Sequence, residues 1–165
     1  MNERSDYMKI TDNHVLFFSK RDMLSNFYPF GFTHQNHNFE TSEQAFMWRK
    51  AIFFDDMTVA YKILYARSPQ EAKRLGRTVS NFDEELWDKV RFNIMKEVVH
   101  DKISQFPRLN DFIQEHKDKT FVEASPYDGI WGVKLNETNP KILNKDNWKG
   151  LNLLGDVFNE LKHEI

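Results

Sequence analysis

A carboxylate and an ammonium group share one face of a predicted helix that begins near residue 42. Either Thr41 or Ser42 can cap this helix, and the spacing of Thr41 and Gln44 is that of a capping box. At about 100° per residue, Glu43 and Lys50 fall within roughly 20° of each other, two turns apart. Their neighbours on this face are apolar, so we expect both charged groups to be buried or to line a cleft.

Two interpretations of this pair stay open. The first is a structural ion pair between Glu43 and Lys50, which would compensate the cost of burying each charge. The second is a polar strip at the floor of a substrate pocket. Glu43 lies in the first helical turn, where the helix dipole favours the ionised carboxylate, so it suits a group that must stay negative better than a general acid.

A second candidate site is the connection around residue 128. Ser125-Pro126 and Asp128-Gly129 both signal turns. Two carboxylates, those of Glu123 and Asp128, are therefore expected at one tight connection with the rings of Tyr127 and Trp131. The structural alternative is an ordinary hairpin in which Asp128 serves only as a turn residue.

Two further stretches are candidates for holding an anion. Gly150 and Asn152 come just before a predicted helix, whose first backbone amides can bind an anion. Arg77 follows Gly76, which is expected to end a helix, and a guanidinium group suits bidentate contacts to phosphate. The structural alternatives are an ordinary helix start and a solvated arginine.

Several other kinds of site are not indicated by the sequence. Without cysteine, disulfides and thiolate metal sites are excluded. The six histidines show no ligand spacing, and His34 and His37 are expected at the surface of a turn. Glycine-rich phosphate loops and a serine-nucleophile elbow are absent.

The length and composition indicate one ordinary domain. A chain of 165 residues is long enough for a real core, and its 15 phenylalanines concentrate burial in large side chains. The net charge of −2 gives no general basic excess for nucleic-acid binding, although a local basic groove is not excluded. Residues 1–12 are polar, show no signal peptide and are expected to be flexible; no run reaches the ~18 apolar residues of a membrane span. These features predict a cytoplasmic protein.

Helices are predicted to dominate, with a few short strands near both ends of the chain. The expected fold is therefore α+β, a single compact domain over residues 1–165. The expected helices cover about 42–54, 56–67, 69–76, 83–106, 109–116 and 151–162. Strands are expected at 14–18, at 120–123 and at 130–135, with strand pieces near residues 30–32 and 39 around a turn at 34–38. A variable loop is expected at 136–147.

Short motifs follow one another in a specific order from about Leu16 to Leu161. They are Leu24-Ser25-Asn26-Phe27-Tyr28-Pro29, Thr41-Ser42-Glu43-Gln44-Ala45-Phe46 with Lys50, Gly76-Arg77, Trp87 with Met95, Ser125-Pro126-Tyr127-Asp128 with Trp131-Gly132, and Gly150-Leu151-Asn152-Leu153-Leu154-Gly155. In this combination the chain resembles the NADAR family, also called YbiA-like. Characterised members include N-glycosidases that act on intermediates of riboflavin biosynthesis. The chain departs from the common pattern at Gln44, where many members have His.

The resemblance implies cleavage of a bond between a ribose C1′ and a nitrogen, without a metal or an organic cofactor. Glu43 is the first choice for the carboxylate that stabilises the oxocarbenium-like state or activates water, with Asp128 as its partner in binding ribose or orienting water. Lys50 and Arg77 are expected to hold a phosphate. The other expected substrate-binding residues are Asn26, Trp87, Tyr127, Trp131, Gly150 and Asn152, and the three aromatic rings among them could stack on the leaving base.

The substrate stays open within this family. It is either a ribosylamino-pyrimidine phosphate of riboflavin biosynthesis or an ADP-ribose adduct, including ADP-ribosylated guanine in DNA. The alternatives are a non-catalytic ADP-ribose or nucleotide-binding module and an interaction domain with an exposed apolar patch. The enzyme interpretation predicts that Glu43, Lys50, Asp128 and Trp131 converge on one cleft. No membrane partner is expected.

Overall fold

The structure, a computed structural model, describes residues 7–165 of the chain. Its internal contacts group into two units: residues 26–105 form one, and the residues before 26 together with residues 106–165 form the other. Of the segment 1–12, which was expected to be flexible, residues 1–6 lie outside the described part. Lys9–Ile10 form a short strand, β1.

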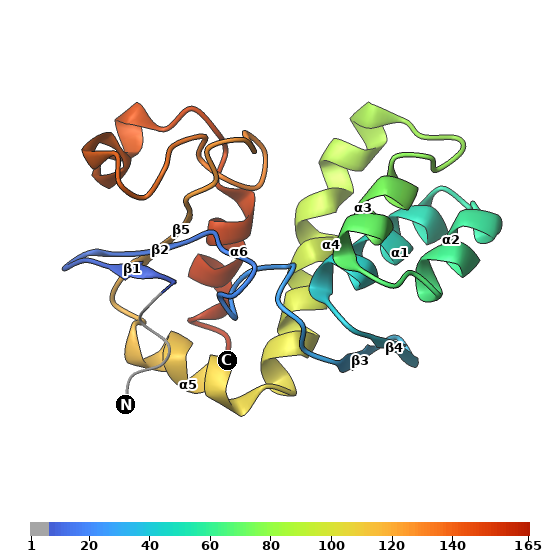
Figure 1. Cartoon of the computed structure of the whole chain (residues 1–165), viewed down its shortest axis with the longest axis horizontal. Helices are drawn as coiled ribbons and strands as arrows, with labels where there is room; N and C mark the ends of the chain where they lie inside the picture. Colours follow the sequence, from blue (N-terminus) through green and yellow to red (C-terminus); the bar gives the residue numbers. More distant parts are fainter. Residues whose placement is uncertain (1–6) are drawn as a thin grey trace. The chain divides into compact units, whose positions relative to one another are not determined.

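The unit of residues 26–105 is built mainly from helices (Figure 1). Four side chains cap these helices, and each accepts a hydrogen bond from the N–H group three residues later. The caps are Thr41, Asp56, Ser68 and Asp83. The elements are β3 (Phe32–His34), β4 (His37–Phe39), α1 (Ser42–Phe53), α2 (Met57–Leu64), α3 (Pro69–Gly76) and α4 (Glu84–Ser104).

Helix α1 is the centre of this unit. It contacts α2, α3 and α4, and every residue from Ser42 to Trp48 is buried. The sheet beside it is the hairpin of β3 and β4, whose turn residues Gln35 and Asn36 both have positive φ. A helix that is apolar nearly all round needs neighbours on most of its faces, so the composition of α1 explains its central position.

The second unit is built around a three-stranded sheet of order β1-β2-β5. Strand β2 (His14–Phe17) pairs antiparallel with β1 and parallel with β5 (Thr120–Glu123), in a register that places Leu16 opposite Val122. Helix α6 (Leu153–Leu161) packs against β5. The remaining elements are α5 (Pro107–Glu115) and two short 3-10 helices, η1 (Pro140–Leu143) and η2 (Lys145–Asn147).

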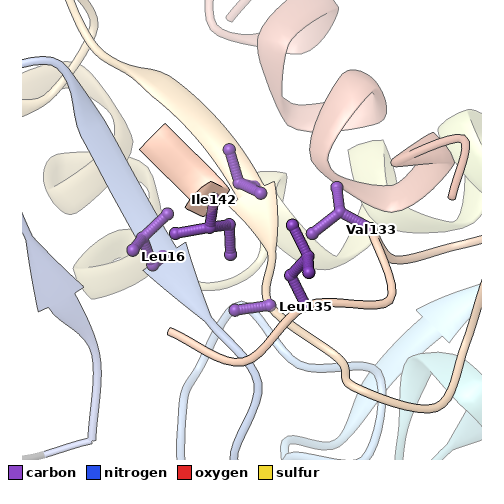
Figure 2. Packing of buried hydrophobic residues seen from close by; sticks show 6 residues of the cluster. Leu16, Val133, Leu135 and Ile142 are labelled. Carbon is purple, nitrogen blue, oxygen red and sulfur yellow. The ribbon is translucent and has the colours of Figure 1, made fainter. Parts of the chain in front are cut away.

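A cluster of buried apolar side chains joins this sheet to the segment that follows it (Figure 2). Trp148 packs against the cluster, and its indole N–H donates to the carbonyl of Ile142 at 2.8 Å. This packing fixes the predicted loop 136–147, which carries the two 3-10 helices. The cluster consists of Leu16, Val122, Ala124, Val133, Leu135 and Ile142.

The α+β class, with mostly helices and a few short strands, is confirmed. The strand predicted at 130–135 is wrong: this segment is irregular, because Lys134 has a φ of 59° that interrupts an extended backbone. Helix α2 also ends at Leu64, before the predicted end at Arg67. No helix among residues 7–165 combines the length and the apolar character needed to cross a membrane.

Gly155 gives a stability test of the way α6 packs. A Cβ atom there would overlap Asn152 Oδ1 and the carbonyl oxygen of Phe121, and neither can move away easily. In an open helix, Gly→Ala stabilises by up to ~1 kcal/mol. Here we expect Gly155→Ala to destabilise the protein by ~1–3 kcal/mol and to lower the melting temperature by about 3–10 °C, measured by thermal unfolding.

Gly31→Ala is the matched control. A Cβ atom at Gly31 would have its nearest neighbour, the carbonyl oxygen of Phe39, at 3.8 Å, which is an ordinary contact. This variant should melt within about 2 °C of the wild type. A Gly155→Ala protein that melts at or above the wild-type temperature would show that the close packing of α6 is wrong.

Candidate active site

Glu43 lies at a rigid helix start in the unit of residues 26–105. The Thr41 hydroxyl accepts the N–H of Gln44 at 3.1 Å, and the backbone N–H of Glu43 donates to the carbonyl of Asn26 at 3.0 Å. The Glu43 side chain is 8% exposed and belongs to the first turn of α1. The turn thus holds a carboxylate in a fixed place, next to the positive end of the helix dipole.

Asn26 positions this turn through its side chain as well. Its Oδ1 accepts the Ser42 hydroxyl at 2.8 Å, and its Nδ2 lies 3.6 Å from the sulfur of Met95 on α4. These contacts connect three segments that are distant in the sequence. A role for Asn26 in orienting Glu43 follows from them, and a direct contact with substrate stays a prediction.

Gln44 has a structural role that sequence reasoning missed. Its Oε1 accepts the N–H of Glu40 at 2.8 Å, and its Nε2 donates to the carbonyls of Ile63 and Leu64. The amide therefore ties the start of α1 to the end of α2. The available signal was the capping-box spacing, although Gln44 reaches back to Glu40 rather than to Thr41.

Lys50 is held at the other end of the polar strip, against α3. Its Nζ donates to the carbonyl of Gly76 at 2.9 Å and lies 4.6 Å from the centre of the Phe82 ring. Burial lowers the pKa of Lys50; the negative charge of Glu43 acts in the opposite direction, and Arg77 adds to the lowering. Glu43 and Arg77 thus both lie near enough to Lys50 to influence its charge; a shared role in binding substrate stays a prediction.

Trp87 packs against other aromatic rings close to Lys50. It is 7% exposed, its ring lies 5.3 Å from that of Phe46 and 6.0 Å from that of Phe54, and the Lys50 Nζ lies 5.9 Å from it. These contacts make Trp87 a core residue, and its ring also lies near the ammonium group of Lys50. Its predicted stacking on a base stays a prediction.

Asp128, in the other unit, organises a tight turn. Its Oδ1 accepts the N–H groups of Ile130 and Trp131 at 2.8 and 2.9 Å, and the Ser125 hydroxyl accepts the N–H groups of Tyr127 and Asp128. Asp128 is therefore a turn residue, as the structural alternative predicted, although the turn does not belong to a hairpin. Among residues 7–165, Oδ2 of Asp128 has no hydrogen-bond partner, so one carboxylate oxygen stays available.

The aromatic residues beside Asp128 differ in exposure. Tyr127 is 81% exposed, and its ring lies 6.3 Å from that of Phe18, whereas Trp131 is half-buried. A ring as open as that of Tyr127 can stack on a ligand without displacing any core contact. Contacts of Tyr127 and Trp131 with a base stay predictions.

Gly150 and Asn152 have packing roles that weaken their prediction as an anion site. The N–H groups of residues 151–154 all donate to the carbonyls of residues 129–132, so these amides are already occupied. A Cβ atom at Gly150 would lie 2.8 Å from the Cα of Gly129. Asn152, fully buried with a φ of 56°, accepts the N–H of Glu123 and donates to the carbonyl of Phe121. Any direct contact of either residue with substrate stays a prediction.

His34 is not at the surface, contrary to the sequence prediction. It is 2% exposed, and its Nδ1 lies 2.7 Å from Asp101 Oδ2, while its Nε2 lies 2.9 Å from Arg49 Nη1. An arginine only donates, so Nε2 of His34 must accept this hydrogen bond. Nδ1 of His34 must then carry the hydrogen and donate a hydrogen bond to Asp101 Oδ2. His37 is exposed as predicted. Among residues 7–165, no group of three or more His, Cys, Asp or Glu side chains could hold a metal ion.

The predicted convergence of Glu43 and Lys50 with Asp128 and Trp131 stays a prediction, because the two pairs belong to different units of the chain. Within its own unit, each pair is ordered by buried hydrogen bonds or close packing. The unit of residues 26–105 supplies a fixed carboxylate, a half-buried ammonium group and an exposed guanidinium group. The other unit supplies a half-buried carboxylate and an open aromatic ring.

Known proteins share both the sequence pattern and the fold. The NADAR domain model matches residues 16–165. The chain is 34% identical over 165 residues to a protein of Acanthamoeba polyphaga mimivirus named N-glycosidase R617, covering 93% of this chain and 97% of that one. It is 33% identical over 167 residues to the Caenorhabditis elegans protein irg-1, covering 92% and 79% of the two chains.

The fold likeness extends to a solved structure. The NMR structure of the E. coli protein YbiA matches with a TM-score of 0.76 and 24% sequence identity, over 98% of this chain and 89% of that one. The match to the family model covers most of the chain, and the resemblance inferred from the motifs is confirmed. The chain belongs to the NADAR domain family.

Proposed function

We propose that this protein is an N-glycosidase that hydrolyses the bond between a ribose C1′ and a nitrogen. Its membership of the NADAR family supports the proposal, as does its similarity to a relative named N-glycosidase. The observation that carries it is the nearly buried carboxylate of Glu43 at a hydrogen-bonded helix start. A strongly desolvated charge of this kind is typical of a functional site.

Glu43 is proposed to act on the sugar. The C1′–N bond breaks through a state with positive charge on the ribose, and a fixed carboxylate beside the ring stabilises that charge or activates the attacking water. Water supplies a hydroxyl group to C1′, while the bonding electrons leave with the nitrogen, which gains a proton. The helix dipole and the nearby charge of Lys50 both favour the ionised carboxylate that this role requires.

The proposed roles of Lys50, Arg77 and Asp128 follow from the charges of their side chains. Lys50 and Arg77 are proposed to hold a phosphate of the substrate, since one is an ordered cation and the other an exposed guanidinium beside it. Asp128 is proposed to bind a ribose hydroxyl or to orient water through its open Oδ2. Both substrate classes, a ribosylamino-pyrimidine phosphate and an ADP-ribose adduct, contain the required ribose and phosphate.

Two sets of incubations identify the substrate class. The protein is incubated with ribosylamino-pyrimidine phosphates in one and with ADP-ribosylated guanine in DNA in the other, and released base or released ADP-ribose is measured. Release from either substrate supports the proposed reaction. Binding of both compounds without release would favour a non-catalytic nucleotide-binding module instead.

Glu43→Gln tests the catalytic carboxylate. The amide is nearly isosteric but carries no negative charge, so we expect kcat to fall by about 10²-fold or more with little change in ligand affinity. If Glu43 only compensated the charge of Lys50, its neutralisation would instead destabilise the protein by about 3–5 kcal/mol. Turnover and thermal melting of the same sample separate these two outcomes.

Glu84→Gln is the matched control, because Glu84 also lies in a first helical turn but is exposed. It should leave both turnover and melting unchanged. A Glu43→Gln protein that melts like the wild type and still turns over at the wild-type rate would refute the catalytic role.

Arg77→Ala tests the phosphate contact. Arg77 is exposed, so its truncation should leave the fold intact. Loss of a hydrogen bond to a charged group should raise KM by about 10-fold or more, with a smaller change in kcat if the contact is equally strong in the ground and transition states. Steady-state kinetics with a phosphorylated substrate measure both quantities, with Arg108→Ala on α5 as a surface-arginine control. An unchanged KM would count against the assignment.

A further inference from the structure

A surface hollow on α2 and α3 lies apart from the residues assigned to the reaction. It has a volume of about 760 Å³ and belongs entirely to the unit of residues 26–105. Neither Glu43 nor Lys50 lines it. Its lining residues are Tyr61, Lys62, Tyr65, Arg67, Glu71, Arg74 and Leu75.

Two tyrosines dominate the apolar part of this hollow. Tyr61 is 62% exposed and Tyr65 is 69% exposed. Tyr61 lies on α2, and Tyr65 caps the C-terminal end of this helix one turn later. Their ring centres are 4.9 Å apart at an interplanar angle of 48°. Two large rings left this open provide a stacking surface that the folded chain does not itself cover.

The polar part of the hollow is mainly cationic. Lys62, Arg67 and Arg74 face a single carboxylate in the lining, that of Glu71. Glu71 Oε2 already accepts the backbone N–H of Arg67 at 2.8 Å, as part of the cap of α3. None of the three cations forms an ion pair with another residue of the range 7–165. Lys62 also lies near Asp56, whose pKa it helps to lower. The lining itself carries three cations and one carboxylate, a local excess of positive charge in a chain of net charge −2.

We propose that this face binds a single-stranded nucleic acid, independently of the reaction assigned to Glu43. Unpaired bases stack on aromatic rings, and each phosphate of the strand needs a nearby cation. The Tyr61–Tyr65 pair supplies the first feature, and Lys62, Arg67 and Arg74 supply the second. An acidic peptide would use only the cations, and a duplex would hide its base faces from the rings.

The hollow also continues beyond these residues. A second hollow of about 730 Å³ in the same unit shares Tyr65 and Arg67 with the first. A ligand bound in one hollow can therefore reach the other past Tyr65 and Arg67. This continuity favours an extended ligand over a single nucleotide.

Fluorescence anisotropy of the full chain with a labelled ten-nucleotide oligothymidylate tests the proposal. We expect saturable binding that weakens as salt rises, because phosphate contacts release counterions. An oligouridylate of the same length shows whether the protein distinguishes RNA from DNA. Binding of either strand supports the proposal. The matching duplex should bind at least 10-fold more weakly than the single strand if stacking on the tyrosines contributes about 1–3 kcal/mol per base.

Paired variants separate the two contributions. Tyr61→Ala with Tyr65→Ala should weaken binding by about 10-fold or more, whereas Tyr61→Phe with Tyr65→Phe keeps both rings and should bind like the wild type. Arg67→Gln with Arg74→Gln should reduce the slope of log affinity against log salt by about 1.4, which is ~0.7 for each lost phosphate contact to a single strand. Arg108→Gln with Lys117→Gln removes two exposed charges from the other unit and serves as the charge control.

Three results would overturn the proposal. The first is no binding of either oligonucleotide by the wild-type chain. The second is an equal loss of affinity in the Arg67/Arg74 and Arg108/Lys117 double variants, which would indicate only a general charge effect. The third is binding of a polyglutamate peptide or of the duplex as tightly as the single strand, because neither can stack bases on the tyrosine pair.

Discussion

A buried carboxylate in the first turn of α1 is the constraint on which the proposed site depends. Removing an ionised group from water costs several kcal/mol unless other groups compensate it. Two features do so around Glu43, the helix dipole and the nearby charge of Lys50. Hydrogen bonds to Thr41 and Asn26 fix the turn that carries the carboxylate. Lys50 is in turn held by the carbonyl at the end of α3, so the packing of α1 against α3 positions both charges.

Several motif residues are explained by packing rather than by chemistry. Asn152 joins the start of α6 to β5, and Gly150 allows the backbone to approach Gly129 and Gly132 closely. Gln44 ties α1 to α2 in the same manner. Asp128 closes a turn with one carboxylate oxygen, and the other stays open for the contact with substrate that we propose. The motifs therefore contain residues with a packing role beside the residues that we propose to act on a substrate.

Local signals in the sequence predicted the helices well and the irregular parts poorly. Capping side chains such as Thr41 and Ser68 act within four residues, so the starts of α1 and α3 could be predicted. The false strand at 130–135 had suitable residues, but its path is set by distant partners and by the left-handed conformation of Lys134. The burial of His34 likewise depends on Asp101, which is distant in the sequence. The grouping of Glu43 with Lys50 could be predicted because helical periodicity alone determines it.

Single-turnover kinetics with the enzyme in excess test the central role of Glu43 most directly, because they separate bond cleavage from substrate binding and product release. The rate of base release is measured against enzyme concentration for the wild type and for Glu43→Gln. A catalytic carboxylate predicts a plateau rate lowered by about 10²-fold with an unchanged half-saturating concentration. An unchanged plateau rate with a raised half-saturating concentration would contradict it, because Glu43 would then contribute only to binding.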